Sequence, residues 1–138
     1  MSIDIIIADD HAILRSGIRK VLEVEDDFTV VAEASNGLAA IDNTLELEPD
    51  ILLLDINMPI KNGFETVTEL VNKKIDTKII ILTINNDENY VLEMLKNGAS
   101  GYLLKDIEPS MLIKAIRKIH QGENYIYPEI ARQIFGDV

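Results

Sequence analysis

Two nearly unbroken runs of aliphatic residues, each followed at once by aspartate, constrain the fold of this 138-residue chain more than any other feature. The first run, Ile3–Ala8, leads into Asp9 and Asp10, and the second, Ile51–Leu54, leads into Asp55. Strands that are buried on both faces, as in parallel sheets, have this continuous apolar character. If the two strands are neighbours, their carboxylates meet at one edge of the sheet.

A cluster of carboxylates at such an edge suits a divalent cation. Like charges that are packed together raise each other's pKa and are poorly tolerated without a cation between them. Carboxylate oxygens and water are also the ligands that Mg2+ prefers. The sequence therefore predicts a metal-assisted site, with Asp9, Asp10 and Asp55 as candidate ligands.

Strand and helix signals alternate along the rest of the chain. Aliphatic or β-branched runs predict strands at residues 3–8, 28–34, 51–55, 78–83 and 101–104. Apolar residues at helical spacing predict helices near residues 13–22, 38–48, 64–72, 88–97 and 109–121. Five strand–helix repeats imply parallel strands joined by right-handed crossovers. The expected fold is therefore α/β: a doubly wound, five-stranded parallel sheet with helices on both faces.

Composition narrows the possible functions. The formal net charge of −11 argues against direct binding to nucleic acid or to an anionic membrane, because both need a basic surface. The absence of cysteine excludes disulfides, thiolate catalysis and cysteine-ligated metals. Asp4 interrupts the first apolar run, so no signal peptide is expected, and no apolar stretch is long enough to span a bilayer. These features indicate a soluble, cytoplasmic domain.

Two further polar residues fall on the same edge of the predicted sheet. Thr83 ends the fourth strand and Lys105 follows the fifth. Ligands of doubly wound sheets bind outside the carboxyl ends of the strands. Asp55 could act there as a metal ligand only, or as a nucleophile that accepts a phosphoryl group. Lys105 and Thr83 could then hold phosphoryl oxygens, while a cation neutralises the arriving charge.

An ordered series of motifs covers essentially the first 120 residues. The motifs are Ile7–His11, Leu54–Pro59, Gly63, Leu82–Thr83 and Gly98–Lys105, together with Asn85–Tyr90 and Gly122–Pro128. Through them the sequence resembles the receiver domain of bacterial two-component response regulators. It is most similar to the subgroup with a LuxR/NarL-type helix-turn-helix output. The resemblance implies a flavodoxin/CheY-like fold and phosphorylation-dependent signalling.

The resemblance also implies the roles of the acidic residues. Asp55 matches the family's phosphoacceptor, which receives its phosphoryl group from a sensor histidine kinase. Asp10 and Asp55 match direct ligands of Mg2+, Asp9 acts mostly through water, and the backbone carbonyl of Asn57 completes the protein ligands. Such a domain is not an enzyme; its own chemistry is limited to self-catalysed phosphoryl transfer and slow autodephosphorylation.

The switch residues follow from the same resemblance. Thr83 and Lys105 match the hydroxyl and amine that bind the phosphoryl oxygens, and Tyr102 matches the aromatic residue whose rotamer follows inward movement of Thr83. Phosphorylation would thereby bias two packings of the surface around the fifth strand. The alternative for Tyr102, taken by itself, is a core residue without a switch role.

The resemblance divides the chain into a receiver domain, residues 1–121, and a linker with a short helix, residues 122–138. The apolar positions of that helix lie between Glu129 and Phe135. We expect the linker to lead to a C-terminal output domain absent from this chain, and DNA to be bound only through that domain. A homodimer on activation is a further expectation, since part of the last helix face could serve a dimer contact.

Three alternative functions can be compared with the residues that each would need. A stand-alone or degenerate receiver that acts by protein–protein contact would share these motifs. A haloacid-dehalogenase-like phosphatase would need a second aspartate two residues after the nucleophile, where this chain has Asn57. A nucleotide-binding module would need a glycine-rich phosphate loop after the first strand, where this chain has residues 8–12, Ala-Asp-Asp-His-Ala.

Four single residues carry narrower expectations. His11 is interpreted as a solvated loop residue in preference to a ligand or base, and Gly17 as a residue that relieves packing of the first helix. Ile84 replaces a residue that is often small in the family, and we expect its bulk to slow loss of the phosphoryl group. Asp106 replaces a frequent proline, so the family's cis bond there would be non-prolyl and cost about 3 kcal/mol.

Overall fold

The computed structural model describes residues 2–84, 88–126 and 131–132. Its elements are β1 (Ile3–Ala8), α1 (Ala12–Glu23), β2 (Phe28–Ala34), α2 (Gly37–Leu47), β3 (Ile51–Asp55), α3 (Gly63–Asn72), β4 (Lys78–Thr83), α4 (Glu88–Lys96), β5 (Gly101–Leu104), α5 (Pro109–His120) and β6 (Tyr125–Ile126). The boundaries of β1 to β5 agree with the strands predicted from the sequence. Among the described residues, no helix is both long and apolar enough to cross a membrane.

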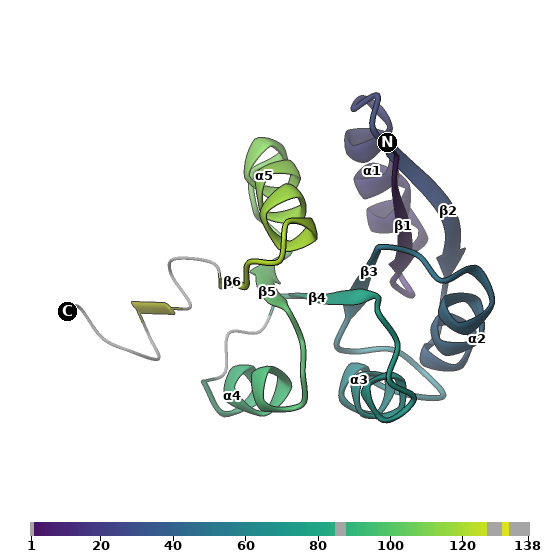
Figure 1. The fold of residues 1–138 in the computed structure, drawn as a ribbon, viewed down its shortest axis with the longest axis vertical. Helices are drawn as coiled ribbons and strands as arrows, with labels where there is room; N and C mark the ends of the chain where they lie inside the picture. Colours follow the sequence, from purple (N-terminus) through teal and green to yellow (C-terminus); the bar gives the residue numbers. More distant parts are fainter. Residues whose placement is uncertain (1, 85–87, 127–130, 133–138) are drawn as a thin grey trace.

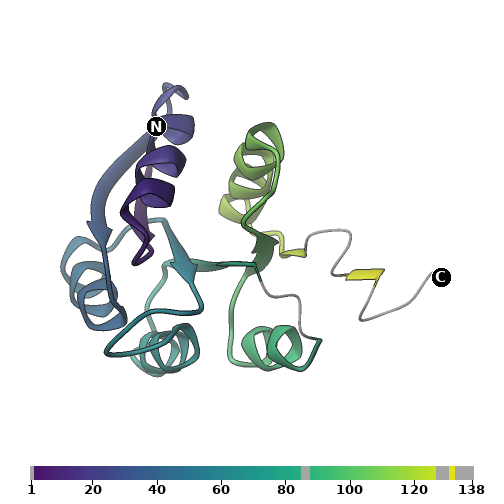
Figure 2. The ribbon, with the colours of Figure 1, turned by 180° about the vertical axis from the view of Figure 1, so that it is seen from behind.

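The strands form one parallel sheet with the order β2-β1-β3-β4-β5-β6. Helices α1 and α5 cover one face of the sheet, and α2, α3 and α4 cover the other (Figures 1 and 2). The predicted doubly wound fold is therefore confirmed. The strand order reverses at β1, so its carboxyl end is the switch point at which such sheets bind ligands.

Each face of the sheet has its own apolar core. In β3, Leu52 and Leu54 join the cluster under α2, α3 and α4, while Ile51 and Leu53 join the cluster under α1 and α5. All four side chains are fully buried. Because successive strand residues point to opposite faces, a central strand covered on both sides needs an unbroken aliphatic run. This requirement explains the two aliphatic runs, Ile3–Ala8 and Ile51–Leu54.

The sheet has six strands, where five were predicted. Tyr125 and Ile126 pair with β5, and the Tyr125 amide donates to the carbonyl of Ser100 at 3.1 Å. Gly122, with φ of 99°, provides the turn after α5 that brings the chain back to the sheet. At Gly101 a Cβ would lie 3.2 Å from the Tyr125 carbonyl and 2.6 Å from Ile119, so only glycine allows this close packing. Part of the segment interpreted as a linker is thus an edge strand.

Local sequence signals explain most helix ends. Asn36 caps α2 by accepting the Ala39 amide at 2.8 Å, and Asn62 forms a capping box with Glu65. Gly98, with φ of 107°, ends α4 as expected. The predicted cap at Asp87, and residues 85–87 of the family motif there, lie outside the described residues, as does most of the predicted helix from Glu129 to Phe135.

Two single-residue expectations are corrected by the backbone. A Cβ built on Gly17 meets no atom within 4 Å, so this glycine does not relieve packing of α1; the exposed side of the helix simply has open space. The peptide bonds of the described residues are all trans, including the bond between Lys105 and Asp106.

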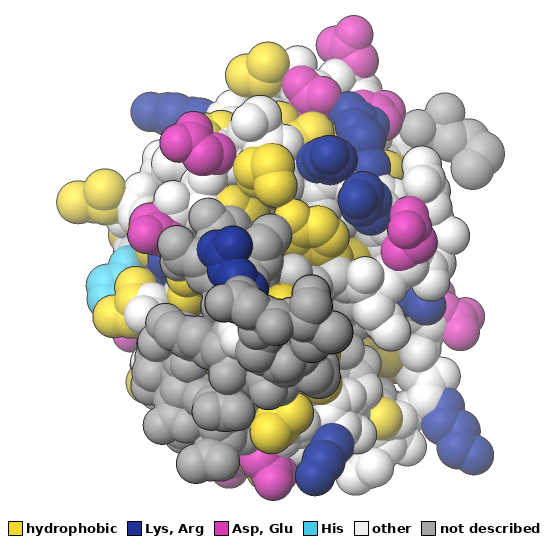
Figure 3. Space-filling model, turned by 90° about the vertical axis from the view of Figure 1, so that its left-hand side faces the viewer, with side chains coloured by type: hydrophobic (Ala, Val, Ile, Leu, Met, Phe, Trp, Pro, Cys, Tyr) yellow, Lys and Arg dark blue, Asp and Glu magenta, His cyan; other side chains and the backbone are white. Residues whose placement is uncertain are grey.

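Charge is distributed unevenly over the surface. Seen from the side of the molecule that lies to the left in Figure 1, lysine and arginine side chains gather in the upper part of the face (Figure 3). Helix α5 itself carries Lys114, Arg117 and Lys118 and has no acidic residue. The strong net negative charge therefore comes from other parts of the molecule.

Candidate functional site

The fold brings the predicted strand-end residues to one edge of the sheet. Strands β1 and β3 are neighbours with Ala8 opposite Leu54, so the aspartates that follow, Asp9 and Asp55, lie side by side. Thr83 ends β4 and is paired with the last residue of β5, directly before Lys105. This spatial grouping was the central prediction from the sequence.

The side chains converge as closely as the backbone suggests. One ligand atom from each of Asp9, Asp10, His11 and Asp55 lies within 4.8 Å of the others. The Lys105 ammonium lies 3.0 Å from Asp9 Oδ2 and 3.2 Å from Asp55 Oδ1. Asp9 and Asp55 are each only 2% exposed, whereas the Asp10 side chain is 34% exposed. The site is thus an acidic pocket that opens to solvent near Asp10.

The pocket fits a hard divalent cation. Asp9 Oδ2 and Asp55 Oδ2 are buried and accept no hydrogen bond, although Lys105 Nζ lies close to the former. Buried carboxylate oxygens without hydrogen-bond partners are costly, and one ammonium cannot neutralise three carboxylates. Oxygen atoms from three carboxylates form the kind of donor set that Mg2+ prefers.

The two oxygens of Asp55 differ in their surroundings. Oδ1 accepts the Asn57 amide at 3.3 Å and lies beside Lys105, while Oδ2 accepts no hydrogen bond. Burial raises the pKa of Asp55 above its ordinary value; Lys105 counteracts this rise and Asp9 adds to it. Asp55 Oδ2 is therefore the oxygen without a hydrogen-bond partner in the protein, and burial increases the basicity of the carboxylate.

The remaining predicted residues surround this pocket. Thr83 is fully buried and its carbonyl accepts the Lys105 amide at 2.8 Å, which fixes the backbone that presents the lysine. Tyr102 on β5 is fully buried in the cluster under α2, α3 and α4. Asn57 is exposed in the loop after β3. All of them therefore lie on the strands or loops where the sequence placed them.

His11 is exposed, as expected for a loop residue, but it is not simply solvated. Its amide donates to Asp9 Oδ1 at 2.8 Å. Its Nδ1 lies 3.1 Å from both Asp9 Oδ1 and Asp10 Oδ1. From the sequence alone, His11 is only adjacent to the two aspartates; its contacts to both carboxylates are visible only in the structure.

Comparison with known proteins shows which family has this arrangement of residues. The family model for the response regulator receiver domain matches residues 5–117. The chain belongs to this family. As a receiver domain it is 41% identical over 135 residues to the transcriptional regulatory protein DegU of Brevibacillus brevis, and 44% identical over 119 residues to the nitrate/nitrite response regulator NarL of Escherichia coli.

These alignments cover 98% and 86% of this chain, but 57% and 55% of DegU and NarL. The chain thus spans a little over half the length of these relatives. Among solved structures, a LuxR-family two-component response regulator from Aurantimonas has a TM-score of 0.93 at 32% identity, covering 98% of this chain and 96% of that one. The isolated receiver domain of RcsB from Salmonella enterica, solved with the phosphomimetic BeF3−, has a TM-score of 0.87 at 30% identity, covering 96% and 98%. The resemblance to the LuxR/NarL-type subgroup is thereby confirmed.

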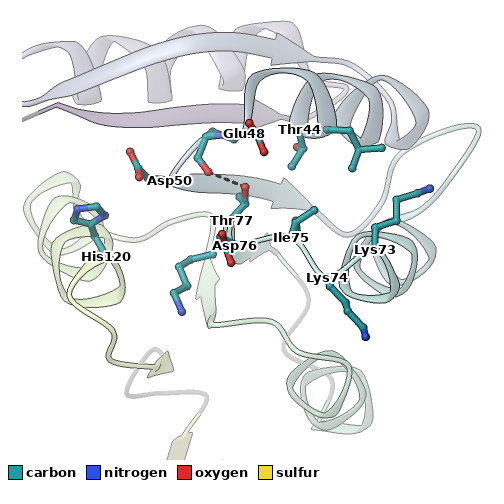
Figure 4. Close-up of a pocket in the computed structure, with 12 residues that line it drawn as sticks. Thr44, Glu48, Asp50, Lys73, Lys74, Ile75, Asp76, Thr77 and His120 are labelled. Carbon is teal, nitrogen blue, oxygen red and sulfur yellow. Dashed lines mark hydrogen bonds between the residues drawn. The ribbon is translucent and has the colours of Figure 1, made fainter.

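A further cavity of the receiver domain lies at the opposite, amino edge of the sheet. It has a volume of about 500 Å3, between the ends of α2 and α3 and His120 of α5 (Figure 4). Lysines (Lys73, Lys74 and Lys78) and carboxylates (Glu48, Asp50 and Asp76) line it in equal number. This mixture selects neither sign of ligand charge, so size alone does not make it the functional site.

Proposed function

We propose that Asp55 accepts a phosphoryl group from a phosphohistidine of a sensor kinase, with Mg2+ held by Asp9, Asp10, Asp55 and the backbone carbonyl of Asn57. The observation that carries the proposal is the buried Asp55 Oδ2, which accepts no hydrogen bond in a pocket that also contains the Lys105 ammonium. Membership of the receiver family supports the same role.

The transfer uses groups that already lie at the carboxyl edge of the sheet. Asp55 Oδ2 attacks phosphorus, the P–N bond to the donor imidazole breaks, and its electron pair returns to the imidazole nitrogen. Lys105 leaves the Asp55 carboxylate and pairs with a phosphoryl oxygen, while the Thr83 hydroxyl donates to another. A bound Mg2+ supplies neutralisation of the charge on the phosphoryl oxygens. The carboxylate acts as a nucleophile, and no nearby carboxylic acid follows it at Asn57 to support rapid turnover.

The same contacts provide a switch. Thr83 and Tyr102 belong to neighbouring strands, β4 and β5, and both are fully buried. Movement of the Thr83 hydroxyl toward a phosphoryl group would alter the packing around Tyr102 and the surface of α4, β5 and α5. Because packed interiors favour discrete arrangements, a small shift at the site can select between two surfaces.

A cavity next to the site is suited to the kinase. It has a volume of about 300 Å3 between α1 and α5 and is almost entirely apolar, with Lys105 at its edge. Ile13, at the rim, is 91% exposed. An amphipathic helix of the kinase placed here would bring its phosphohistidine to Asp55.

In the longer protein we expect the switch to control a DNA-binding output domain in the cytoplasm, with homodimer formation on activation. The support comes from relatives: DegU is named a transcriptional regulatory protein, and dimers of RcsB have been solved bound to DNA. A stand-alone receiver that acts by protein contact is the alternative. The length of the reading frame in the genome distinguishes a stand-alone receiver from a regulator with an output domain.

Intact mass spectrometry tests the proposed chemistry. After incubation with acetyl phosphate and Mg2+, the chain is expected to gain one phosphoryl group. Asp55→Asn, or chelation of the metal, is expected to abolish the gain, whereas Asp76→Asn at the amino edge is a matched control that should retain it. An unmodified wild-type chain would show that this is a degenerate receiver.

We expect Ile84 to affect the lifetime of the phosphoryl group on Asp55. Its side chain directly follows Thr83 and is 80% exposed, so it is positioned at the surface around the pocket. We expect Ile84→Ala to lose its phosphoryl group a few-fold faster, because water reaches the acyl phosphate more easily. Decay followed by mass spectrometry at the wild-type rate would remove this role.

A further inference from the structure

We propose that Arg15, locked in place by Glu33, is a positioning residue that sets the orientation of the Asp9–Asp10 carboxylates and thereby the affinity of the pocket for Mg2+. The inference rests on the function proposed above. Arg15 lies on α1, and its side chain bonds to Glu33 and to the backbone carbonyl of Asp9.

The first observation is a direct contact from Arg15 to the backbone of Asp9 and Asp10, the two residues called the acidic turn below. Arg15 Nη1 donates to the carbonyl oxygen of Asp9 at 2.6 Å. This carbonyl belongs to the peptide unit that joins Asp9 to Asp10. Since a peptide unit is planar, holding its oxygen restricts the rotation that would point the Asp10 side chain elsewhere.

The second observation is that the arginine itself is held. Arg15 Nε donates to Glu33 Oε1 at 2.8 Å, and the two side chains are only 19% and 28% exposed. Arg19 donates to the other oxygen of Glu33 at 2.6 Å. Its hydrogen bond, followed by that of Arg15, lowers the pKa of Glu33, so the carboxylate stays ionised. The guanidinium is therefore fixed by two charge-assisted contacts, one to β2 and one to the acidic turn.

The third observation is that the backbone amide of Asp9 also binds to β2. The Asp9 amide donates to the carbonyl of Ala34, next to Glu33 on β2, at 2.9 Å. The end of β2 thus holds the Asp9 amide directly through Ala34, and it holds the Asp9 carbonyl indirectly through Glu33 and Arg15. Partners that orient metal ligands in this manner typically change metal affinity by about 10–100-fold when they are removed.

Electrostatics alone predicts the opposite effect, which makes the inference testable. Removing a positive charge near an acidic pocket should strengthen the binding of a cation. Loss of orientation should weaken it. The sign of the change in affinity for Mg2+ therefore separates a positioning role from a simple charge effect.

Isothermal titration calorimetry of the 138-residue chain with MgCl2, without any phosphoryl donor, measures this sign directly. We expect Arg15→Ala to weaken Mg2+ binding about tenfold. Arg15→Lys, which keeps the charge and one donor, should recover part of the loss. Glu33→Ala, which leaves Arg15 present but unanchored, should give an intermediate loss.

Arg19→Ala is the matched control, since it removes the same charge and another contact to Glu33 but no contact to Asp9. We expect it to bind Mg2+ as tightly as wild type or slightly more tightly. Thermal unfolding without Mg2+ accompanies each titration, so that loss of the fold is distinguished from loss of affinity. Phosphorylation of Arg15→Ala should then recover at high Mg2+ concentration.

The inference is overturned if Arg15→Ala, folded as wild type is, binds Mg2+ equally or more tightly, or if Arg19→Ala loses as much affinity. The same experiment keeps the two proposals apart. A wild-type chain that binds no Mg2+ would contradict the proposed function as well, whereas wild-type binding and phosphorylation with an unaffected Arg15→Ala would contradict the positioning role alone.

Discussion

The two edges of the sheet are built on different principles. At the amino edge, the Asp50 carboxylate accepts the Asp4 amide, the Thr77 hydroxyl donates to Pro49, and Arg117 of α5 pairs with Asp27 and Glu25. The buried side-chain atoms near this edge that make no hydrogen bond, Thr44 Oγ1 and Asn97 Nδ2, carry no charge. At the carboxyl edge, two buried carboxylate oxygens accept no hydrogen bond, from Asp9 and Asp55.

Exposed apolar residues and left-handed backbone occur at both edges, with Val24, Glu48 and Lys74 on the amino side. Ile13, Ile60 and Ile84, in the segments that follow β1, β3 and β4, are between 70% and 91% exposed. Ile60 also has a φ of 69°, which is unfavourable for a β-branched residue. The contrast between the edges therefore rests on charge: the carboxyl edge retains buried carboxylate oxygens without hydrogen bonds, a cost that a cationic ligand removes. The following predictions test this contrast, from the largest effect to the smallest.

Gly37→Ala is expected to cost the most. A Cβ at Gly37 would lie 2.0 Å from the carbonyl oxygen of Lys61 and 2.5 Å from Thr66 Oγ1, so the loop after β3 must move. Overpacking against backbone typically destabilises a fold by about 1–3 kcal/mol, and we expect the upper part of this range. Urea unfolding measures the loss.

The matched control for this prediction is Gly17→Ala, in the open part of α1. Alanine favours a helix over glycine by about 1 kcal/mol, so this variant should gain stability. Equal losses in both variants would mean that the close approach of Lys61 to Gly37 has no energetic importance.

Asp55→Asn is expected to stabilise the metal-free chain by about 1–2 kcal/mol near neutral pH, because a buried, poorly compensated charge disappears. Burial raises the pKa of Asp55 above its ordinary value of 3.8. A carboxyl with a raised pKa in the folded state destabilises the fold as pH rises through the window from the unfolded to the folded pKa.

The advantage of Asp55→Asn should therefore shrink as the pH falls toward 3.8. Thermal unfolding at several pH values, without Mg2+, measures the difference. An advantage that grows in acid would mean that the carboxylate is stabilised in the folded chain, and would remove the contrast between the edges. Saturating Mg2+ should stabilise wild type and not the variant, by about 2.7 kcal/mol at a concentration a hundred times Kd.

Arg117→Ala tests the amino edge. The guanidinium lies 4.7 Å from the centroid of the Phe28 ring and pairs with two carboxylates of the turn before β2. We expect a loss of about 1 kcal/mol, mainly from the cation–π contact, since exposed ion pairs add little. Phosphoryl incorporation should be unchanged, and a loss of incorporation would show that the two edges are coupled.

Ile60→Gly should have the smallest effect. Relief of the left-handed conformation is worth about 1–2 kcal/mol, and the extra freedom of glycine costs about 0.5–1 kcal/mol, which leaves a gain of about 0.5 kcal/mol. The side chain is 70% exposed, so little packing is lost. Ile84→Gly is the control, because Ile84 is as exposed but has an ordinary φ and should gain nothing.

The sequence allowed the central part of the fold to be predicted because buried parallel strands need unbroken aliphatic runs. It also predicted the grouping of Asp9, Asp55, Thr83 and Lys105, since residues that follow neighbouring parallel strands meet at one edge. These inferences depend only on local patterns and on topology. They therefore required no knowledge of side-chain packing.

The remaining features depend on contacts between distant residues. The pairing of Tyr125 with β5 requires space at Gly101, and a two-residue strand has no periodic signal of its own. The contact from Arg15 to Asp9 depends on Glu33, on another element, which no spacing in the sequence indicates. Gly17 was misinterpreted because a glycine in a helix has the same appearance in sequence whether its surroundings are crowded or open.

The most direct test of this account is to locate the phosphoryl group. The chain, treated with acetyl phosphate and Mg2+, is reduced with borohydride, which converts an aspartyl phosphate to homoserine, and is then digested and mapped by mass spectrometry. We expect homoserine at position 55 alone. Modification at Asp9, Asp10 or any other carboxylate, with Asp55 unchanged, would contradict the assignment of the nucleophile.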